Sequence, residues 1–292
     1  MKWKEQFFSL IIFLLIPSNF LVWQEIFDFS KGLMNVVFFD VGQGDAIFIE
    51  TPQGHQILID GGPGKQILEK LNENIPFWDR TIDLIILTHP DADHLAGLNY
   101  VLQNYKVKNI LWNGVKKETQ TFKDWEKKLA KEKNKDKANI IIAQKGQKIK
   151  ASDAEFYILY LFENLEGKIF KKNTNKDSIV SKLFFGKNTF LFTADIDQKT
   201  EKQFLEEKIN LNAQVLKVAH HGSKISCFEE FLKEVSPDFA VISSGKNNPY
   251  HFPNQETLEK LQNIGAKILR TDQKGDIKMV SDGINLKILN QK

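Results

Sequence analysis

The chain has 292 residues, of which 42% are hydrophobic and 26% are charged, values ordinary for a folded globular protein with a large core. The single cysteine, Cys227, excludes an intrachain disulfide and a cysteine-only metal site. The formal net charge of +3 is too small to indicate a polyanionic partner by itself. One substantial domain, or one formed from two similar halves, is the expected organisation.

The N-terminal residues 1–30 resemble a membrane-targeting segment. Lys2 and Lys4 precede the apolar stretch FFSLIIFLLIPSNFLVW at residues 7–23. Its strongly apolar part, residues 7–16, is short for a full membrane span, and no small-x-small cleavage site follows. We expect a signal anchor or an uncleaved signal, with a cleaved signal peptide and a soluble amphipathic arm as alternatives. A signal or anchor would place the rest of the chain outside the cytoplasmic membrane, either anchored or secreted.

Residues 34–290 are predicted to form an α/β domain. MNVVFFDVGQGDAIFIET, QILIDGG and IDLIILTH have the apolar runs of strands, and residues 63–71 and 94–103 have helical spacing. KNILWNG and NIIIAQKG are further strands, with a lysine-rich helix between them.

The second half repeats this rhythm. The apolar runs EFYILYLF, SIVSKLFFG, NTFLFTAD, QVLKVAHHGS and FAVISSG predict strands, and residues 198–208, 228–235 and 255–264 predict helices. KILRTDQKGDIKMVSDG is expected to close the chain as a hairpin. Strands outnumber helices and alternate in blocks, which indicates two sheets with helices on their outer faces.

Nine lysines lie between residues 116 and 137, interleaved with Glu126 and Glu132. A solvated helix face explains such a segment. A basic rim for nucleic acid is the alternative.

Polar side chains follow five of the predicted strands, where loops leaving the carboxyl ends of strands can converge on one pocket. These candidates are Asp60, His89, Asp91, Asp93, His94, Asp195, His220, His221 and His251.

The loop THPDADH carries the densest cluster. Between a strand and a helix, its alternate side chains can point to one side, so that His89 and Asp91 face one metal while Asp93 and His94 face a second. Helix capping by an aspartate is the alternative, but it does not account for both histidines. Asp195 is either a turn residue or a carboxylate bridging two cations about 3.5 to 4 Å apart.

These motifs resemble a known family. THPDADH is similar to the HxHxDH signature of the metallo-β-lactamase fold. DVGQGD, LIDGG, LFTAD, LKVAHHGS and SSGKNNPYHFP resemble the nuclease domain of ComEC-type DNA-uptake (competence) proteins. The resemblance covers about residues 34–282 and implies an αββα sandwich with a dinuclear site at one edge.

The resemblance also implies roles for individual residues. His89 and Asp91 would bind one divalent ion, Asp93 and His94 the other, and Asp195 would bridge the two. His221 matches the last ligand, and His251 is a further candidate ligand or substrate contact. Asp60 supports the site, while Asp45 and His220 lie beside it.

Two departures from the family pattern bear on the metals. Asp91 stands where most of the superfamily has histidine, which moves the preference toward Mn²⁺ or Mg²⁺ beside Zn²⁺. The histidine expected between the first cluster and Asp195 is missing, and NTNKDS at residues 173–178 occupies that region.

The function implied is a metal-dependent phosphodiesterase, specifically a DNA nuclease. Asp93 would orient the attacking hydroxide, and Lys217 or Lys246 would neutralise the phosphate. One alternative is a metallo-hydrolase for a small ester, lactam or phosphodiester. Another is a membrane-tethered binding protein with a degraded site. DNA and, through the N-terminal segment, a membrane are the expected partners.

Overall fold

The structure is a computed structural model that describes residues 3, 13, 15, 32–160, 165–170 and 174–289. The expected signal anchor therefore lies almost wholly outside the described residues. Among the residues that are described, no helix has the length and apolar character needed to cross a membrane.

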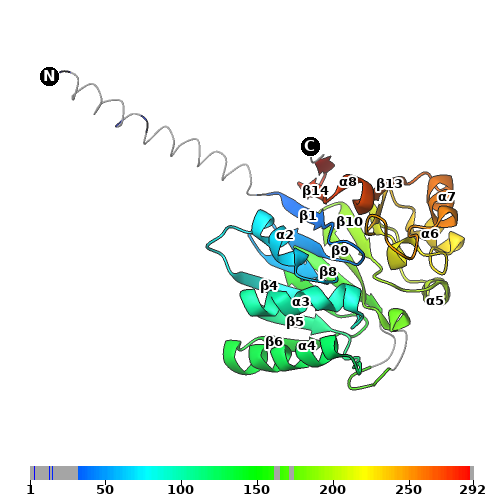
Figure 1. Cartoon of the computed structure of the whole chain (residues 1–292). Coiled ribbons are helices and arrows are strands. Elements are labelled where there is room, and N and C mark those ends of the chain that lie inside the picture. Colours follow the sequence, from blue (N-terminus) through cyan, green and yellow to red (C-terminus); the bar gives the residue numbers. More distant parts are fainter. Residues whose placement is uncertain are drawn as a thin grey trace.

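Two mixed sheets form the centre of the molecule (Figure 1). The first sheet has the strand order β15-β14-β1-β2-β3-β4-β5-β6. Its strands are β1 (Met34–Phe38), β2 (Ile47–Glu50), β3 (Gln56–Ile59), β4 (Thr81–Leu87), β5 (Lys106–Trp112), β6 (Asn139–Ile142), β14 (Ile277–Ser281) and β15 (Leu286–Leu289).

The second sheet has the order β13-β12-β11-β10-β9-β8-β7. Its strands are β7 (Lys148–Ala151), β8 (Ala154–Tyr160), β9 (Val180–Phe185), β10 (Asn188–Phe192), β11 (Val215–Lys217), β12 (Phe239–Ile242) and β13 (Lys267–Arg270).

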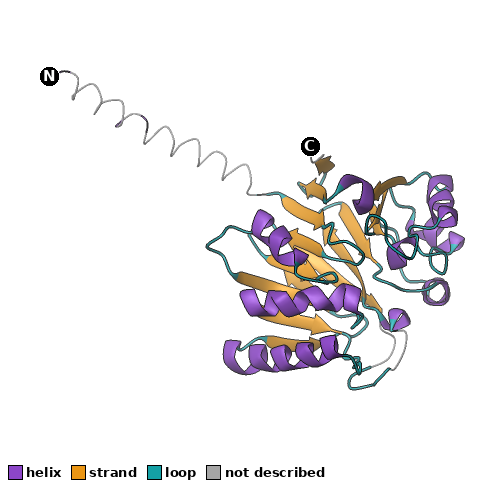
Figure 2. Ribbon diagram, viewed as in Figure 1, coloured by secondary structure: helices purple, strands orange, loops and turns teal. Residues whose placement is uncertain are grey.

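Helices cover the outer face of each sheet (Figure 2). The first sheet carries α2 (Gln66–Asn74), α3 (Ala92–Asn104) and α4 (Gln120–Lys131), and the second carries α5 (Gln198–Glu206), α6 (Glu229–Val235) and α7 (Gln255–Asn263). A short helix, α8 (Thr271–Lys274), follows β13. The expected α/β class and αββα layering are confirmed.

Side-chain alternation along the strands builds these layers. In β1, Val36 and Phe38 enter the core between the two sheets, whereas Val37 and the following Phe39 pack under the helices of the first sheet. Because both faces of each sheet are covered, strands such as β4 read as nearly continuous apolar runs.

The hairpin expected at KILRTDQKGDIKMVSDG is wrong. β13 pairs in parallel with β12 of the second sheet, whereas β14 pairs with β1 of the first. α8 lies between them, so this segment crosses from one sheet to the other and closes the sandwich. The hairpin forms one strand later, between β14 and β15, where Asp282 accepts backbone N–H groups in the turn.

Strand direction decides where the polar loops meet. β3, β4, β5 and β6 run parallel in the first sheet, and β10, β11, β12 and β13 run parallel in the second. The loops that leave β3, β4, β10 and β11 carry Asp60, THPDADH, Asp195 and the His220–His221 pair. These loops converge at one edge of the sandwich.

Candidate metal centre

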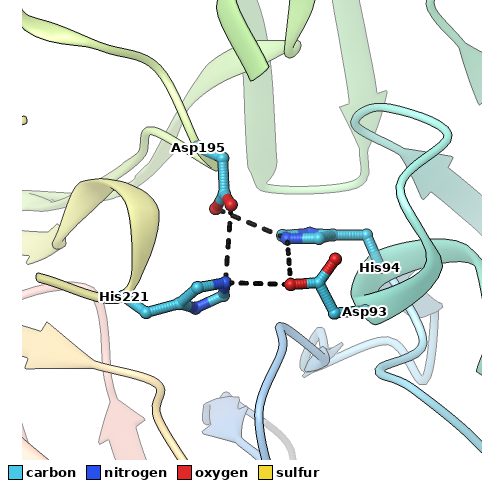
Figure 3. Close-up of side chains that lie close together, drawn as sticks. All are labelled: Asp93, His94, Asp195 and His221. Atoms are coloured by element: carbon cyan, nitrogen blue, oxygen red, sulfur yellow. Dashed lines mark ion pairs between the residues drawn. The ribbon is translucent and has the colours of Figure 1, made fainter. Parts of the chain in front are cut away.

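Four side chains from three separate loops meet at this edge (Figure 3). Asp93 and His94 lie in the first turn of α3, Asp195 follows β10, and His221 follows β11. One ligand atom from each lies within 4.8 Å of the others. This is the gathering that the sequence motifs predicted.

The first imidazole is oriented by a buried carboxylate. Asp60, fully buried, accepts hydrogen bonds from the backbone N–H and the hydroxyl of Thr88 at 2.8 and 2.7 Å. Its second oxygen lies 2.8 Å from His94 Nδ1. With the proton on Nδ1, the lone pair of His94 Nε2 faces Asp195, 3.4 Å from its Oδ1. A carboxylate that fixes the tautomer in this way is typical of metal-binding histidines.

The second imidazole is held by the backbone. His221 Nδ1 lies 3.0 Å from the carbonyl oxygen of Ser243, to which it donates. His221 Nε2 therefore points at two carboxylates, 3.4 Å from an oxygen of Asp93 and 3.4 Å from one of Asp195. The backbone of both His220 and His221 is left-handed, with φ of 50° and 54°. Such conformations cost energy in non-glycine residues and cluster at functional sites.

Unsatisfied buried atoms test whether a cation fits here. Within the described part of the chain, His94 Nε2, His221 Nε2 and Asp195 Oδ1 are buried without a hydrogen-bond partner. Leaving a buried polar atom unpaired typically costs about 1–3 kcal/mol. The three atoms converge with the Asp93 carboxylate on one point, and this donor set is one that divalent metals accept. The residues are thus arranged to bind a metal.

The shifted pKa values of the four-residue cluster also favour a bound cation. Burial lowers the pKa of His94, but the carboxylates of Asp195, Asp60 and Asp93 outweigh it and raise that pKa well above the usual value. For Asp195, burial raises the pKa, yet His221 and His94 hold it well below its usual range. The cluster therefore favours positive charge, which a bound cation supplies.

The other half of the THPDADH loop is arranged differently. His89 is fully buried, and its Nε2 has no hydrogen-bond partner among the described residues. Asp91 is the N-cap residue of α3, but the hydrogen bonds described for its carboxylate come from Lys117 and Thr174 and not from the helix. Capping therefore does not explain this aspartate.

The expectation that Lys217 neutralises a substrate phosphate is corrected. Its ammonium is buried and lies 2.6 Å from a carboxylate oxygen of Asp45, and it also donates to the carbonyl of Val218 at 3.0 Å. Asp45 in turn lies 3.4 Å from His221 Nδ1. Lys217 thus balances a buried charge behind the site and does not face a substrate.

Three other candidates are not part of the four-residue cluster among the described residues. His220 Nε2 lies 3.1 Å from the side-chain amide of Asn175 and 3.9 Å from Asp195. Lys246 and His251 are exposed in the loop after β12. Among the described residues, His251 does not join the four-residue cluster, and its neighbour Phe252 packs against the His220 and His221 rings.

Several residues that contact the site could not be read from the motifs. Ser243 offers a backbone carbonyl, which no side-chain pattern reveals. Thr88, in contrast, is the first residue of THPDADH and directly follows β4, so its position is a usable signal. Lys117 is one lysine among nine in its segment, and Thr174 lies in the NTNKDS stretch, which has no histidine.

The chain is similar to several known proteins. Residues 39–246 match the family model of the metallo-β-lactamase superfamily. ComE operon protein 3 of Bacillus subtilis is 33% identical over 68% of this chain and 24% of its own length. Recombination protein 2 of Haemophilus influenzae is 28% identical over 71% of this chain and 24% of its own length.

Competence protein ComA of Neisseria gonorrhoeae is 39% identical over a shorter stretch, 35% of this chain and 15% of its own length. The expected resemblance to competence proteins is confirmed. The chain spans about a quarter of the length of the first two relatives.

Among solved structures, the metallo-β-lactamase fold protein YhfI from Bacillus subtilis has a TM-score of 0.57 and 16% identity, over 86% of this chain and 100% of that one. Igni18, a metallo hydrolase from Ignicoccus hospitalis, has a TM-score of 0.51 and 17% identity, over 89% of this chain and 100% of that one. At these identities the likeness concerns the fold alone.

Proposed function

Because the chain belongs to the metallo-β-lactamase superfamily, we propose that it is a metal-dependent phosphodiesterase that cleaves DNA. The observation that carries the proposal is the convergence of Asp93, His94, Asp195 and His221 with their buried nitrogen and oxygen atoms unpaired. Names of the relatives, which refer to competence and recombination, support DNA as the substrate.

These four residues would hold a divalent ion, with Mn²⁺, Mg²⁺ and Zn²⁺ as candidates. A divalent ion would supply Lewis acidity, activating a water and withdrawing charge from the phosphate. The buried imidazoles keep their orientation through Asp60 and Ser243, so the site is set before any substrate arrives.

Asp93 has the position to orient the attacking water. Its side chain is 35% exposed, whereas those of His94, Asp195 and His221 are at most 3% exposed. A substrate entering from solution therefore meets Asp93 first. One of its oxygens lies 3.4 Å from His221 Nε2, and the exposed part of the carboxylate remains accessible as a hydrogen-bond acceptor for water.

Other elements offer exposed positive charge. Lys246 is exposed in the loop after β12, and the exposed side chains of the 116–137 segment lie on α4 and beyond it, since Phe122 and Trp125 form its buried face. We assign Lys246 to phosphate contact and this segment to a basic rim for the DNA backbone.

We further propose that residues 1–30 tether the domain of residues 34–290 to the outer face of a membrane, as an anchor or signal. The basic leader followed by an apolar run supports this. β1 is antiparallel to β2, which is antiparallel to β3, so Met34 lies at the edge opposite Asp60. A tether there leaves the site facing away from the membrane.

DNA cleavage by the purified full chain tests the proposal. Labelled single- and double-stranded DNA is incubated with Mn²⁺, Mg²⁺ or Zn²⁺, alongside a β-lactam and a small phosphodiester. We expect metal-dependent cleavage that Asp93→Ala reduces by at least about 100-fold. Asp153→Ala, at an exposed turn, is the matched control and should cleave like the wild type. Intact DNA under every metal would contradict the proposal.

A further inference from the structure

The Asp91 carboxylate already holds a cation from the chain itself. Lys117 Nζ lies 2.5 Å from Asp91 Oδ1, and the two side chains are only 15% and 24% exposed. The hydroxyl of Thr174 donates to the same oxygen. A charge-assisted hydrogen bond of this length is among the stronger side-chain contacts in proteins. The negative charge of Asp91 is therefore balanced by the Lys117 ammonium before any metal binds.

The backbone around Lys117 fixes its direction. Lys116 N donates to the Lys168 carbonyl at 2.9 Å, and Phe170 N donates to the Lys116 carbonyl at 3.1 Å, so the loop after β5 is paired with residues 168–170. The adjacent Lys116 ammonium points elsewhere, 2.8 Å from Glu126. Lys117 is thus held beside Asp91 by a backbone segment that is hydrogen-bonded to residues 168–170, and not by a free surface loop.

The His89–Asp91 half also lacks a gathered set of ligands. Among the described residues, the donor groups compact enough for a metal are Asp93–His94–Asp195–His221 and Asp45–Asp60–His94, and neither includes His89 or Asp91. A divalent ion here would have to displace an ammonium that is covalently part of the chain, against like-charge repulsion.

We propose that the Lys117 ammonium is a built-in cation that takes the place of a metal in the His89–Asp91 half. The protein then binds one divalent ion tightly, at Asp93, His94, Asp195 and His221, and Lys117 supplies the positive charge on the other side of the phosphate. This inference rests on the proposed metal-dependent function, but it concerns the number of ions and not the reaction.

The number of bound metal ions distinguishes the inference about Lys117 from the proposed metal-dependent function. Mn²⁺ binding to the full chain is followed by calorimetry, and paramagnetic resonance detects spin-coupled ion pairs. We expect one tight equivalent for the wild type and a second for Lys117→Met, at least tenfold tighter than any second ion in the wild type, with the spectrum of a coupled pair. Lys117→Arg keeps the charge and should still bind one.

Lys116→Met is the matched control, because it removes a neighbouring lysine that pairs with Glu126, and it should bind one ion. Two equally tight ions in the wild type, or no gain in Lys117→Met, would overturn the inference while leaving a metal hydrolase intact. A complete absence of bound Mn²⁺ in all four proteins would instead contradict the metal centre on which both claims rest.

Discussion

Asp60 shows how one buried carboxylate can control a whole site. It joins the Thr88 backbone, the Thr88 hydroxyl and His94 Nδ1, all within 2.8 Å. No part of Asp60 or His94 is exposed to solvent. The carboxylate therefore selects which imidazole nitrogen carries the proton, and with it the nitrogen that can bind a metal.

Replacing Asp60 with asparagine should impair metal binding without removing a ligand. If the new amide nitrogen faces His94 Nδ1, the imidazole proton moves to Nε2 and blocks the metal-facing lone pair. We expect Mn²⁺ affinity to fall by roughly 10–100-fold in calorimetry. Asp83→Asn, on β4 but bound to Lys108 and Gln56, is the control. Unchanged affinity in Asp60→Asn would show that Asp60 does not set the tautomer.

Lys217 and Asp45 form a buried ion pair, both at most 2% exposed. Removing one partner of such a pair typically costs about 3–5 kcal/mol, because the other charge stays buried alone. We expect Lys217→Met to lower the free energy of unfolding in urea by about that amount, and Asp45→Asn/Lys217→Met to lower it less. A stable Lys217→Met protein with a raised KM for DNA would return Lys217 to the phosphate-binding role that the sequence suggested.

At the scale of elements, the turn after β1 sets the position of α3. Asp45 N donates to the Asp93 carbonyl at 3.3 Å, and Gly62 N donates to the Asp45 carbonyl at 2.8 Å. Gly44 has a φ of +142°, and a Cβ there would lie 2.1 Å from the Asp93 carbonyl oxygen. A side chain at this position would push the first turn of α3 away from Asp195.

Gly44→Ala should therefore damage the metal centre from outside it. We expect Mn²⁺ affinity to fall at least about tenfold, since a backbone oxygen cannot move aside as a flexible side chain can. Gly42→Ala is the matched control, because Gly42 also has a positive φ but has no atom within 4 Å of the built Cβ. Equal Mn²⁺ affinities for the two variants would contradict the role of this contact.

Glu201 links two helices of the second sheet. It lies in α5, is fully buried, and accepts the backbone N–H groups of Cys227 and Phe228, which precede α6, at 2.9 and 2.6 Å. Burial raises the pKa of Glu201 from 4.5 to about 7, against the opposing effect of these two N–H groups. Between pH 4.5 and about 7, the Glu201 carboxyl therefore keeps its proton in the folded protein but loses it in the unfolded chain.

Because the pKa of Glu201 is raised in the folded protein, its contribution to the free energy of unfolding is complete below about pH 4.5. This contribution is lost as the pH rises to about 7. Glu201→Gln does not titrate there. The free energy of unfolding of the wild type, measured in urea against Glu201→Gln, should fall by on the order of 3 kcal/mol across this window. A difference between the two proteins that stays constant with pH would contradict the assignment.

Much of the fold could be predicted because strands and helices follow from the local pattern of apolar residues. The apolar run of β4 and the helical spacing of α3 follow from residues next to one another, and THPDADH covers the loop between them and the first turn of α3. The β13–β14 segment could not be predicted, since its turn residues suit a hairpin while its partners lie in different sheets. Which strand a segment pairs with depends on the whole chain.

The candidate site could be predicted in part, again from patterns along the chain. The convergence of Asp93, His94, Asp195 and His221 could be predicted because loops that leave strand ends meet at one edge of an α/β sandwich. The partners of Asp45 and Asp91 could not be predicted, because Lys217 and Lys117 are 172 and 26 residues away and resemble other lysines in sequence. Long-range ion pairs leave no periodic signal.

At the scale of the whole molecule, the two sheets bring their loops together at one edge, where we propose that a divalent ion binds. Anomalous diffraction from crystals grown with Mn²⁺ tests it most directly. The account predicts a strong peak bonded to Asp93, His94, Asp195 and His221, and loss of that peak in Asp195→Ala. Crystals with no peak at these four side chains, or with Mn²⁺ bound only elsewhere on the surface, would contradict it.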